Sequence, residues 1–213
     1  MLNSYDSYLS AIKLADLGLN TAQCEAAARF AVILERENQS QNLTRIMGIT
    51  SFVQGHLLDV VELCHVEQLG ARVLDIGSGS GVPGLLAAAI DLSPTRLWYL
   101  TDSEKSKAEY LKNAATELGL SRVIVMEKRA EEVIDLIKPD TVIARAVGKV
   151  EKIFQWIMDC STWNNLVLFK SIGWKEEWIA AQQTRFGKKL TITQAIEYSS
   201  EEKYRVLVNL MRK

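Results

Sequence analysis

The residues from Arg72 to Gly84 constrain this chain more than any other stretch. Their sequence is RVLDIGSGSGVPG, an apolar run that ends in a glycine-rich turn. The β-branched and bulky residues suit a buried strand, whereas the closely spaced glycines permit positive φ angles and let a ligand approach the backbone. An Ala/Leu-rich segment follows. The pattern therefore predicts a strand, a phosphate- or nucleoside-binding turn, and a helix whose N-terminus faces the ligand.

Asp75 distinguishes between two ligands for this turn. Gly79-x-Gly81-x-x-Gly84 fits the dinucleotide-binding fingerprint, which by itself is a weak signal. A carboxylate at the end of the strand would repel a pyrophosphate, but it can hold the ammonium group of an amino-acid-bearing nucleoside. S-adenosylmethionine carries such a group and NAD does not. Asp75 therefore favours S-adenosylmethionine.

A second carboxylate, Asp102, follows the next apolar run, 96–101. It lies at about the spacing of 20 residues after the glycine turn that is expected of an acid that accepts ribose hydroxyls. The alternative is that Asp102 only caps a helix beginning at Ser103, since aspartate is a good N-cap residue. Together with Asp75 and the glycines, the ribose interpretation is favoured.

Apolar strand patterns alternate with helical patterns from Arg72 onward. The expected strands are 73–76, 97–101, 123–126, 141–144 and 166–169, and the expected helices are 82–91, 103–118, 130–137, 149–159 and 174–185. This alternation predicts right-handed crossovers, a mostly parallel twisted sheet, and ligands at the carboxyl ends of its strands.

Two β-rich runs end the chain, 189–198 and 204–210. The polar segment between them is too short for a crossover helix, so they should pair antiparallel. A parallel sheet that ends in an antiparallel hairpin is typical of the α/β, Rossmann-like class I methyltransferases. Dehydrogenases end with a further parallel strand or a substrate domain.

The first 68 residues have helical patterns. We expect one helix that stops near Gly18, a second that is capped by Thr21, a polar flexible stretch over 35–41, and a further helix over 52–66. The expected organisation is a helical extension, 1–68, packed on a Rossmann-like domain, 69–213.

Composition limits the partners. Lys+Arg 25 against Asp+Glu 26 gives a net charge of −1, so any binding to nucleic acid must come from a local basic patch. The cysteines are far apart and the histidines few, which argues against a metal site and suits a reducing cytosol. We expect neither a signal peptide nor a segment that crosses a bilayer, because the N-terminal residues are polar and no apolar run is long enough. We expect a cytoplasmic, monomeric protein without a membrane or metal partner.

Several motifs recur in an order that resembles a known family, the bacterial small-subunit ribosomal RNA guanine-N7 methyltransferases, also called glucose-inhibited division protein B. The resemblance runs from the N-terminal helices to the last strand. The matching motifs are Asn42-Leu-Thr44, His56-Leu-Leu-Asp59, Asp75 to Gly84, Asp102-Ser103, Arg129-Ala-Glu-Glu132, Arg145-Ala146 and Lys170.

The resemblance implies an S-adenosylmethionine-dependent enzyme that methylates N7 of one guanine in a 16S ribosomal RNA loop near the decoding region. Its substrate would be the free RNA or the small-subunit particle. With the glycine turn and the two aspartates, the expected cofactor-binding residues are Asp75, Gly77, Ser78, Gly79, Gly81, Val82, Asp102, Ala130, Glu131 and Arg145. The family's basic face near the target base corresponds to Arg129, Arg145 and Lys170.

The chain departs from the family pattern beside these motifs. Gln54-Gly55 stands where the family usually has Val-Arg, and Val60 where it has Ser. Likewise Ser106-Lys107 replaces Lys-Arg, Ala144 replaces Ser, and Ser171 replaces Gly. These changes leave the cofactor interpretation intact and bear on the RNA target.

The expected chemistry needs no general base, because guanine N7 has an in-plane lone pair and no proton. Arg145 and Lys170 are the candidate catalytic residues, since arginine and lysine bind the O6/N7 edge of guanine. Each is alternatively a solvated cation at a strand end. Two other functions remain open: a class I methyltransferase with another RNA or a small-molecule acceptor, and an NAD-linked oxidoreductase or nucleotide-binding module.

Overall fold

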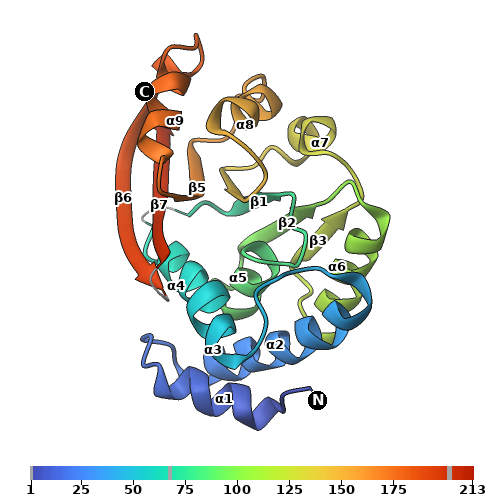
Figure 1. Cartoon of the computed structure of the whole chain (residues 1–213). Coiled ribbons are helices and arrows are strands. Elements are labelled where there is room, and N and C mark those ends of the chain that lie inside the picture. The colour runs from blue at the N-terminus through green and yellow to red at the C-terminus, as the bar shows by residue number, and fades with distance from the viewer. Residues whose placement is uncertain (1, 67–68, 201–202) are drawn as a thin grey trace.

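The computed structural model describes residues 2–66, 69–200 and 203–213. A single twisted sheet of seven strands, in the order β3-β2-β1-β4-β5-β7-β6, forms its centre (Figure 1). The first five strands are parallel, and β7 lies antiparallel between β5 and β6. Their bounds are β1 Arg72–Ile76, β2 Leu97–Thr101, β3 Val123–Met126, β4 Thr141–Arg145, β5 Asn165–Ser171, β6 Leu190–Ser200 and β7 Lys203–Arg212. The expected α/β fold with a terminal antiparallel hairpin is confirmed.

Successive residues of the central strands point to opposite faces of the sheet and enter two separate cores. In β4, Val142 belongs to one core and Ile143 to the other, and in β5 Leu166 and Val167 divide in the same way. All four side chains are buried. Because both faces are covered by helices, the middle residues of these strands are apolar without alternation, and the polar residues stand at the strand ends.

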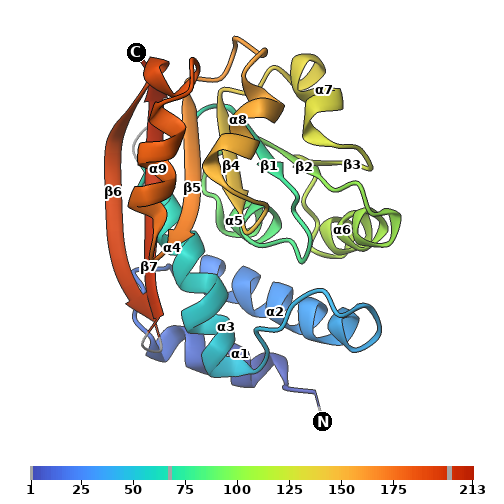
Figure 2. The same cartoon turned by 45° about the horizontal axis from the view of Figure 1, so that its top comes forward.

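Helices cover both faces of the sheet (Figure 2). The helices on one face are α2 Thr21–Gln41, α3 Ile49–Phe52, the π-helix η1 Val53–Leu57, α4 Leu58–Cys64, α5 Gly84–Ile90 and α6 Lys105–Glu117, and α1 Tyr5–Leu14 packs on the outer side of α2 and on α3. The other face packs against α7 Ala130–Ile137, α8 Val150–Ile157 and α9 Trp174–Gln182, which the short 3-10 helix η2 Gly187–Lys189 follows. No described helix is long and apolar enough to cross a membrane.

Helix α2 is longer than expected. The stretch 35–41, predicted to be flexible, is helical, and the N-cap is Asn20, not Thr21. Glu35 and Asn38 are buried in spite of their polarity, because each has hydrogen-bond partners outside the helix. The Tyr8 hydroxyl donates to Glu35, and Asn38 Oδ1 accepts from the Thr44 N–H at 2.7 Å. Tertiary hydrogen bonds therefore override the local polar pattern.

The helix expected over 52–66 begins earlier, at Ile49, and contains the π-helical turn of η1. A Cβ atom on Gly55, in this turn, would lie 2.8 Å from Ile46 Cγ2. Glycine therefore lets the loop before the helix pack directly on the helix backbone.

The predicted division at residue 68 falls outside the described residues, and the two-domain organisation stays a prediction. One core nevertheless contains side chains from α1, α2, α5 and the sheet, such as Ile12, Phe30, Leu85 and Ile143. In the hairpin, Ser200 pairs with Lys203, and residues 201–202 of the predicted connection lie outside the described part of the chain.

Candidate functional site

Two hollows lie at the carboxyl edge of the parallel strands, on either side of the 145–148 loop that follows β4. Here β1 and β4 are neighbours, the chain leaves β1 toward β2 and leaves β4 toward β5, and a crevice opens between these two connections. The first, the glycine hollow, has a volume of about 360 Å³ and is lined by Ile76, Gly77, Gly79, Thr101, Asp102, Ser103, Lys107, Lys128, Arg129, Ala130, Glu131, Val147 and Trp156. The second, the arginine hollow, is lined by Asp59, Arg145, Ala146, Gly148, Phe169, Lys170, Ser171, Ile172, Glu177, Tyr198, Tyr204 and Arg205.

The glycine turn owes its shape to backbone angles that other residues rarely adopt. Gly77, Gly79 and Gly81 have φ values of 65, 50 and 82°. A Cβ atom on Gly77 would lie only 2.5 Å from Val147 Cγ1. The turn can therefore pack against the loop after β4 only while residue 77 has no side chain.

Asp75 lies beneath this turn and not in the lining of the hollow. It is 1% exposed, and its Oδ2 accepts from the Gly84 N–H at 3.0 Å. Burial raises the pKa of its carboxyl to about 7. The other oxygen, Oδ1, is buried and has no hydrogen-bond partner. A donor such as an ammonium group would satisfy it, and the expected contact with the cofactor stays a prediction.

Asp102 lies in the lining and supports the turn. Its Oδ2 accepts from the Gly79 N–H at 3.0 Å and its Oδ1 from the Glu104 N–H at 2.9 Å. Helix α6 begins at Lys105 and its N-cap is Glu104, so the alternative that Asp102 caps a helix beginning at Ser103 is wrong. The carboxylate instead bonds the backbone N–H of the N-cap residue and holds the glycine turn. Each oxygen retains a lone pair for a hydroxyl donor.

The other predicted cofactor residues divide into three groups. Gly77, Gly79, Ala130 and Glu131 line the glycine hollow together with Arg129. Ser78, Gly81 and Val82 are buried within the turn, behind the lining. Arg145 lies in the other hollow. The structure thus brings the ends of β1 and β2 together with the start of α7 in the glycine hollow. It places Arg145 on the other side of the 145–148 loop.

Arg145 is held by residues from the N-terminal helices. Its Nε lies 3.2 Å from Asp59 Oδ2, and its two terminal nitrogens bond His56 Nδ1 and the Gly55 carbonyl at 3.1 and 3.0 Å. Burial lowers the pKa of its guanidinium, although Asp59 acts in the opposite direction. Arg145 is therefore not the solvated cation of the alternative interpretation.

Arg205 and Tyr198 join the same network from the terminal hairpin. Both bond Asp59 Oδ1, Arg205 at 2.7 Å and the Tyr198 hydroxyl at 2.8 Å. Arg205 also donates to the Gly55 carbonyl at 2.9 Å. The sequence motifs include Asp59 but give no signal for Arg205 or Tyr198, because these two residues belong to the two β-rich runs at the end of the chain.

His56 is neutral in this network. Burial, and then the positive charges of Arg145 and Arg205, lower its pKa to about 3. Because Nδ1 accepts from Arg145, the proton resides on Nε2, which lies 3.3 Å from Thr44 Oγ1. With both ring nitrogens engaged, His56 orients Arg145 and is not free to act as a base.

Lys170 lies beside Arg145 in the arginine hollow, because β4 and β5 are paired with Arg145 opposite Phe169. Its Nζ donates to Glu177 Oε2 at 2.8 Å and to the Gly148 carbonyl at 3.0 Å. Phe169, Tyr198 and Tyr204 add aromatic surface to the same hollow. Trp156 lines the glycine hollow instead. Among the described residues, no group of three or more His, Cys, Asp or Glu side chains could hold a metal ion.

The sheet order, the terminal hairpin and the hollow beside the glycine turn define a Rossmann-like fold of the class I methyltransferase type. The structure is similar to M. capricolum TrmK in complex with S-adenosyl-homocysteine, with a TM-score of 0.58, 12% identity, and coverage of 73% of this chain and 68% of that one. It is also similar to magnesium protoporphyrin IX methyltransferase from Synechocystis PCC 6803, with a TM-score of 0.56, 18% identity, and coverage of 86% and 97%. At these identities the likeness concerns the fold.

The sequence places the chain more narrowly. The family model described as rRNA small subunit methyltransferase G (GidB) matches residues 23–207, and the chain belongs to this family. It is 35% identical over 150 residues to ribosomal RNA small subunit methyltransferase G of Rhodopirellula baltica, a match that spans 70% of this chain and 64% of that relative. The relative from Aromatoleum aromaticum is 37% identical over 142 residues, or 64% and 67% of the two chains. The resemblance noted from the motifs is confirmed, as is the methyltransferase class.

Proposed function

We propose that this chain transfers the methyl group of S-adenosylmethionine to N7 of a guanine in 16S ribosomal RNA. The substrate is the free RNA or the small-subunit particle, and the protein acts as a cytoplasmic monomer. The observation that carries the proposal is the adjacency of the two hollows across residues 145–148. A cofactor in the glycine hollow and a base in the arginine hollow would meet at this loop.

Residues of the glycine hollow fit the parts of S-adenosylmethionine, which supplies an electrophilic methyl group on a sulfonium. Asp102, in the lining, can accept from ribose hydroxyls. Gly77 and Gly79 let the ligand approach the backbone. Asp75 has one oxygen without a donor, and an ammonium group would supply that donor. NAD brings no such group.

The arginine hollow fits a guanine. Its aromatic side chains, Phe169, Tyr198 and Tyr204, offer apolar faces for an unstacked base. Lys170 and Arg145 are donors suited to O6 of the base or to an adjacent phosphate, which leaves N7 free to attack. Because N7 carries no proton, the absence of a free histidine base in the described hollow is compatible with this reaction. Catalysis then comes from alignment and from exclusion of water.

The test is methyl transfer with labelled cofactor to purified 16S ribosomal RNA and to small-subunit particles, followed by nucleoside analysis. We expect the label in 7-methylguanosine. Label only in free nucleotides or other small molecules would instead support the alternative acceptor. In calorimetry, S-adenosylhomocysteine should bind and NAD should not.

A further inference from the structure

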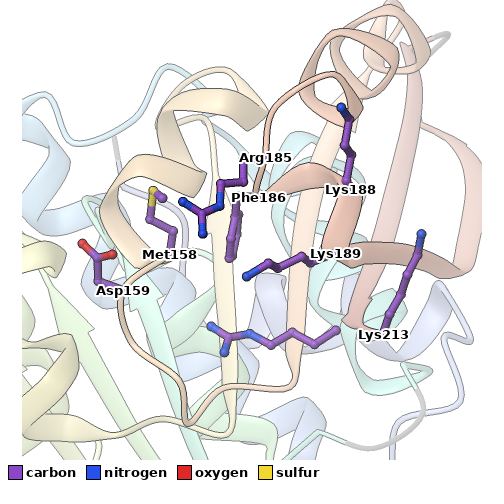
Figure 3. Close-up of a pocket in the computed structure, with 8 residues that line it drawn as sticks. Met158, Asp159, Arg185, Phe186, Lys188, Lys189 and Lys213 are labelled. Carbon is purple, nitrogen blue, oxygen red and sulfur yellow. The ribbon is translucent and has the colours of Figure 1, made fainter.

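A third hollow, which we call the basic hollow, lies apart from the two just described. It has a volume of about 540 Å³. Five cationic side chains and one carboxylate are among its lining residues, which are Met158, Asp159, Arg185, Phe186, Lys188, Lys189, Arg212 and Lys213. Figure 3 shows Arg185 and Lys189 extending toward the side where Met158 and Asp159 lie. In a chain with a net charge of −1, this is a local concentration of positive charge.

Three exposed cations of the basic hollow form no ion pair with other described residues. In the described part of the chain, no ion pair involves Arg185, Lys188 or Lys189. All three are exposed. By contrast, the cations of the arginine hollow already have carboxylate partners, Asp59 for Arg145 and Glu177 for Lys170. Exposed cations without a carboxylate partner favour the binding of an anion.

Arg212 gives the hollow a rigid floor. Its guanidinium carbon lies 4.1 Å from the centre of the Trp163 ring, and it donates to the Cys160 carbonyl. Its Nε is buried and has no partner. Phe186 packs on the rings of Phe154 and Trp163, so the hollow has no free aromatic face for a base. These features suit a phosphate group and not a nucleobase.

The basic hollow lies at the amino end of β5, whereas the arginine hollow lies at the carboxyl end of the same strand. Arg212 is next to Met211, which pairs with Asn165 at the start of β5, whereas Lys170 and Ser171 end that strand. A strand of seven residues spans roughly 20 Å. A ligand that touches both hollows must therefore be long.

We propose that the basic hollow binds the phosphate backbone of the substrate RNA, at a segment distant from the methylated guanine. This inference rests on the proposed function for the identity of the RNA. The basic hollow would provide a second contact for a long RNA or a particle. A short RNA would not reach this hollow, so its binding would not depend on it. A polyanion of this length supplies phosphates at both edges of the sheet simultaneously.

The test compares two charge-matched double variants. R185Q/K188Q removes two exposed cations of the basic hollow and leaves Arg212 in place, so the core is kept. K13Q/R29Q removes two exposed cations from α1 and α2, at the end of the molecule far from the C-terminus in Figure 1. Binding to a long 16S ribosomal RNA fragment and to a short oligonucleotide around the acceptor guanine is measured over a range of salt concentrations, with S-adenosylhomocysteine present.

For the long RNA, we expect R185Q/K188Q to reduce the slope of log K against log salt by about 1.4, since each single-stranded phosphate contact contributes about 0.7. K13Q/R29Q should keep the wild-type slope, and neither variant should change binding of the short RNA. An unchanged slope in R185Q/K188Q, or an equal loss in K13Q/R29Q, would overturn the inference. Formation of 7-methylguanosine by the wild type on the same long RNA tests the proposed function separately.

Discussion

Asp59 holds Arg145 in the arginine hollow, with 3.2 Å between Oδ2 and Nε. The same carboxylate bonds Arg205 through its other oxygen at 2.7 Å. Asp59 is 3% exposed and each arginine side chain 15%. One buried carboxylate therefore binds two guanidinium groups. It connects the N-terminal helices to the end of β4 and to the terminal hairpin.

Replacing Asp59 by Asn should be strongly destabilising, because two buried cations would lose their counter-charge. We expect a loss of about 3–5 kcal/mol in the free energy of unfolding. Glu117→Gln is the matched control, because Glu117 pairs with Arg36 at the same 2.7 Å but on an exposed surface. It should cost about 1 kcal/mol or less. Equal costs in denaturant unfolding would contradict the proposed role of the buried pair.

His56 should make the protein sensitive to acid. Its folded-state pKa is lowered to about 3, whereas the unfolded chain takes up the proton below about 6.5. Stability is therefore lost as the pH falls from 6.5 toward 3, by about 1.4 kcal/mol per pH unit. His56→Asn should remove this dependence when unfolding is measured against pH. His65→Asn, at an exposed site, should keep the wild-type slope.

Asp75 should act in the opposite direction. Burial raises its folded-state pKa from 3.8 to about 7, so the native protein retains a proton that the unfolded chain releases. This contribution is lost as the pH rises from about 4 to 7. Relative to Asp75→Asn, the wild type should therefore become less stable over this window.

The same carboxyl should report cofactor binding. An ammonium group near Asp75 favours the ionised form, so binding of S-adenosylhomocysteine near pH 6 should release a proton from the wild type. Calorimetry in buffers of different ionisation enthalpy measures this release. Asp75→Asn should bind more weakly and release none. Equal affinity and equal proton release in the two proteins would remove Asp75 from the site.

Gly77→Ala should impair the glycine hollow. The substitution adds a left-handed backbone penalty of about 1–2 kcal/mol and forces Val147 away from the turn. We expect affinity for S-adenosylhomocysteine to fall about tenfold or more. Gly119→Ala is the control, since Gly119 has a φ of 70° with open space around it. It should lower stability without changing affinity in calorimetry.

Lys170→Ala should reduce methyl transfer to RNA more than it weakens cofactor binding, because Lys170 lies in the arginine hollow and not in the glycine hollow. Lys175→Ala, which removes an exposed lysine paired with Glu197 at 3.7 Å, is the matched control. Turnover and calorimetry on both variants separate the effects. Full activity in Lys170→Ala would favour another acceptor.

Local patterns in the sequence were sufficient for the strands, the glycine turn and the antiparallel hairpin. The bounds of β2 and β3 agree with the prediction, 97–101 and 123–126. Each strand is an apolar run with turn residues on either side, and this signal lies within the segment itself. The same applies to Asp75 and Asp102, which follow from their positions at strand ends. The flexible stretch predicted over 35–41 was wrong because the partners of Glu35 and Asn38 are not adjacent in the sequence.

The sequence by itself thus determined the family, the fold class and the carboxylates at the ends of β1 and β2. Only the tertiary structure decided which residues hold Arg145. Tyr198 and Arg205 lie 139 and 146 positions from Asp59, yet they share its carboxylate. No local periodicity relates residues so far apart. They meet because the sheet places β7 beside β5 and the N-terminal helices pack over that edge, and a buried carboxylate is stable only where donors from separate elements converge.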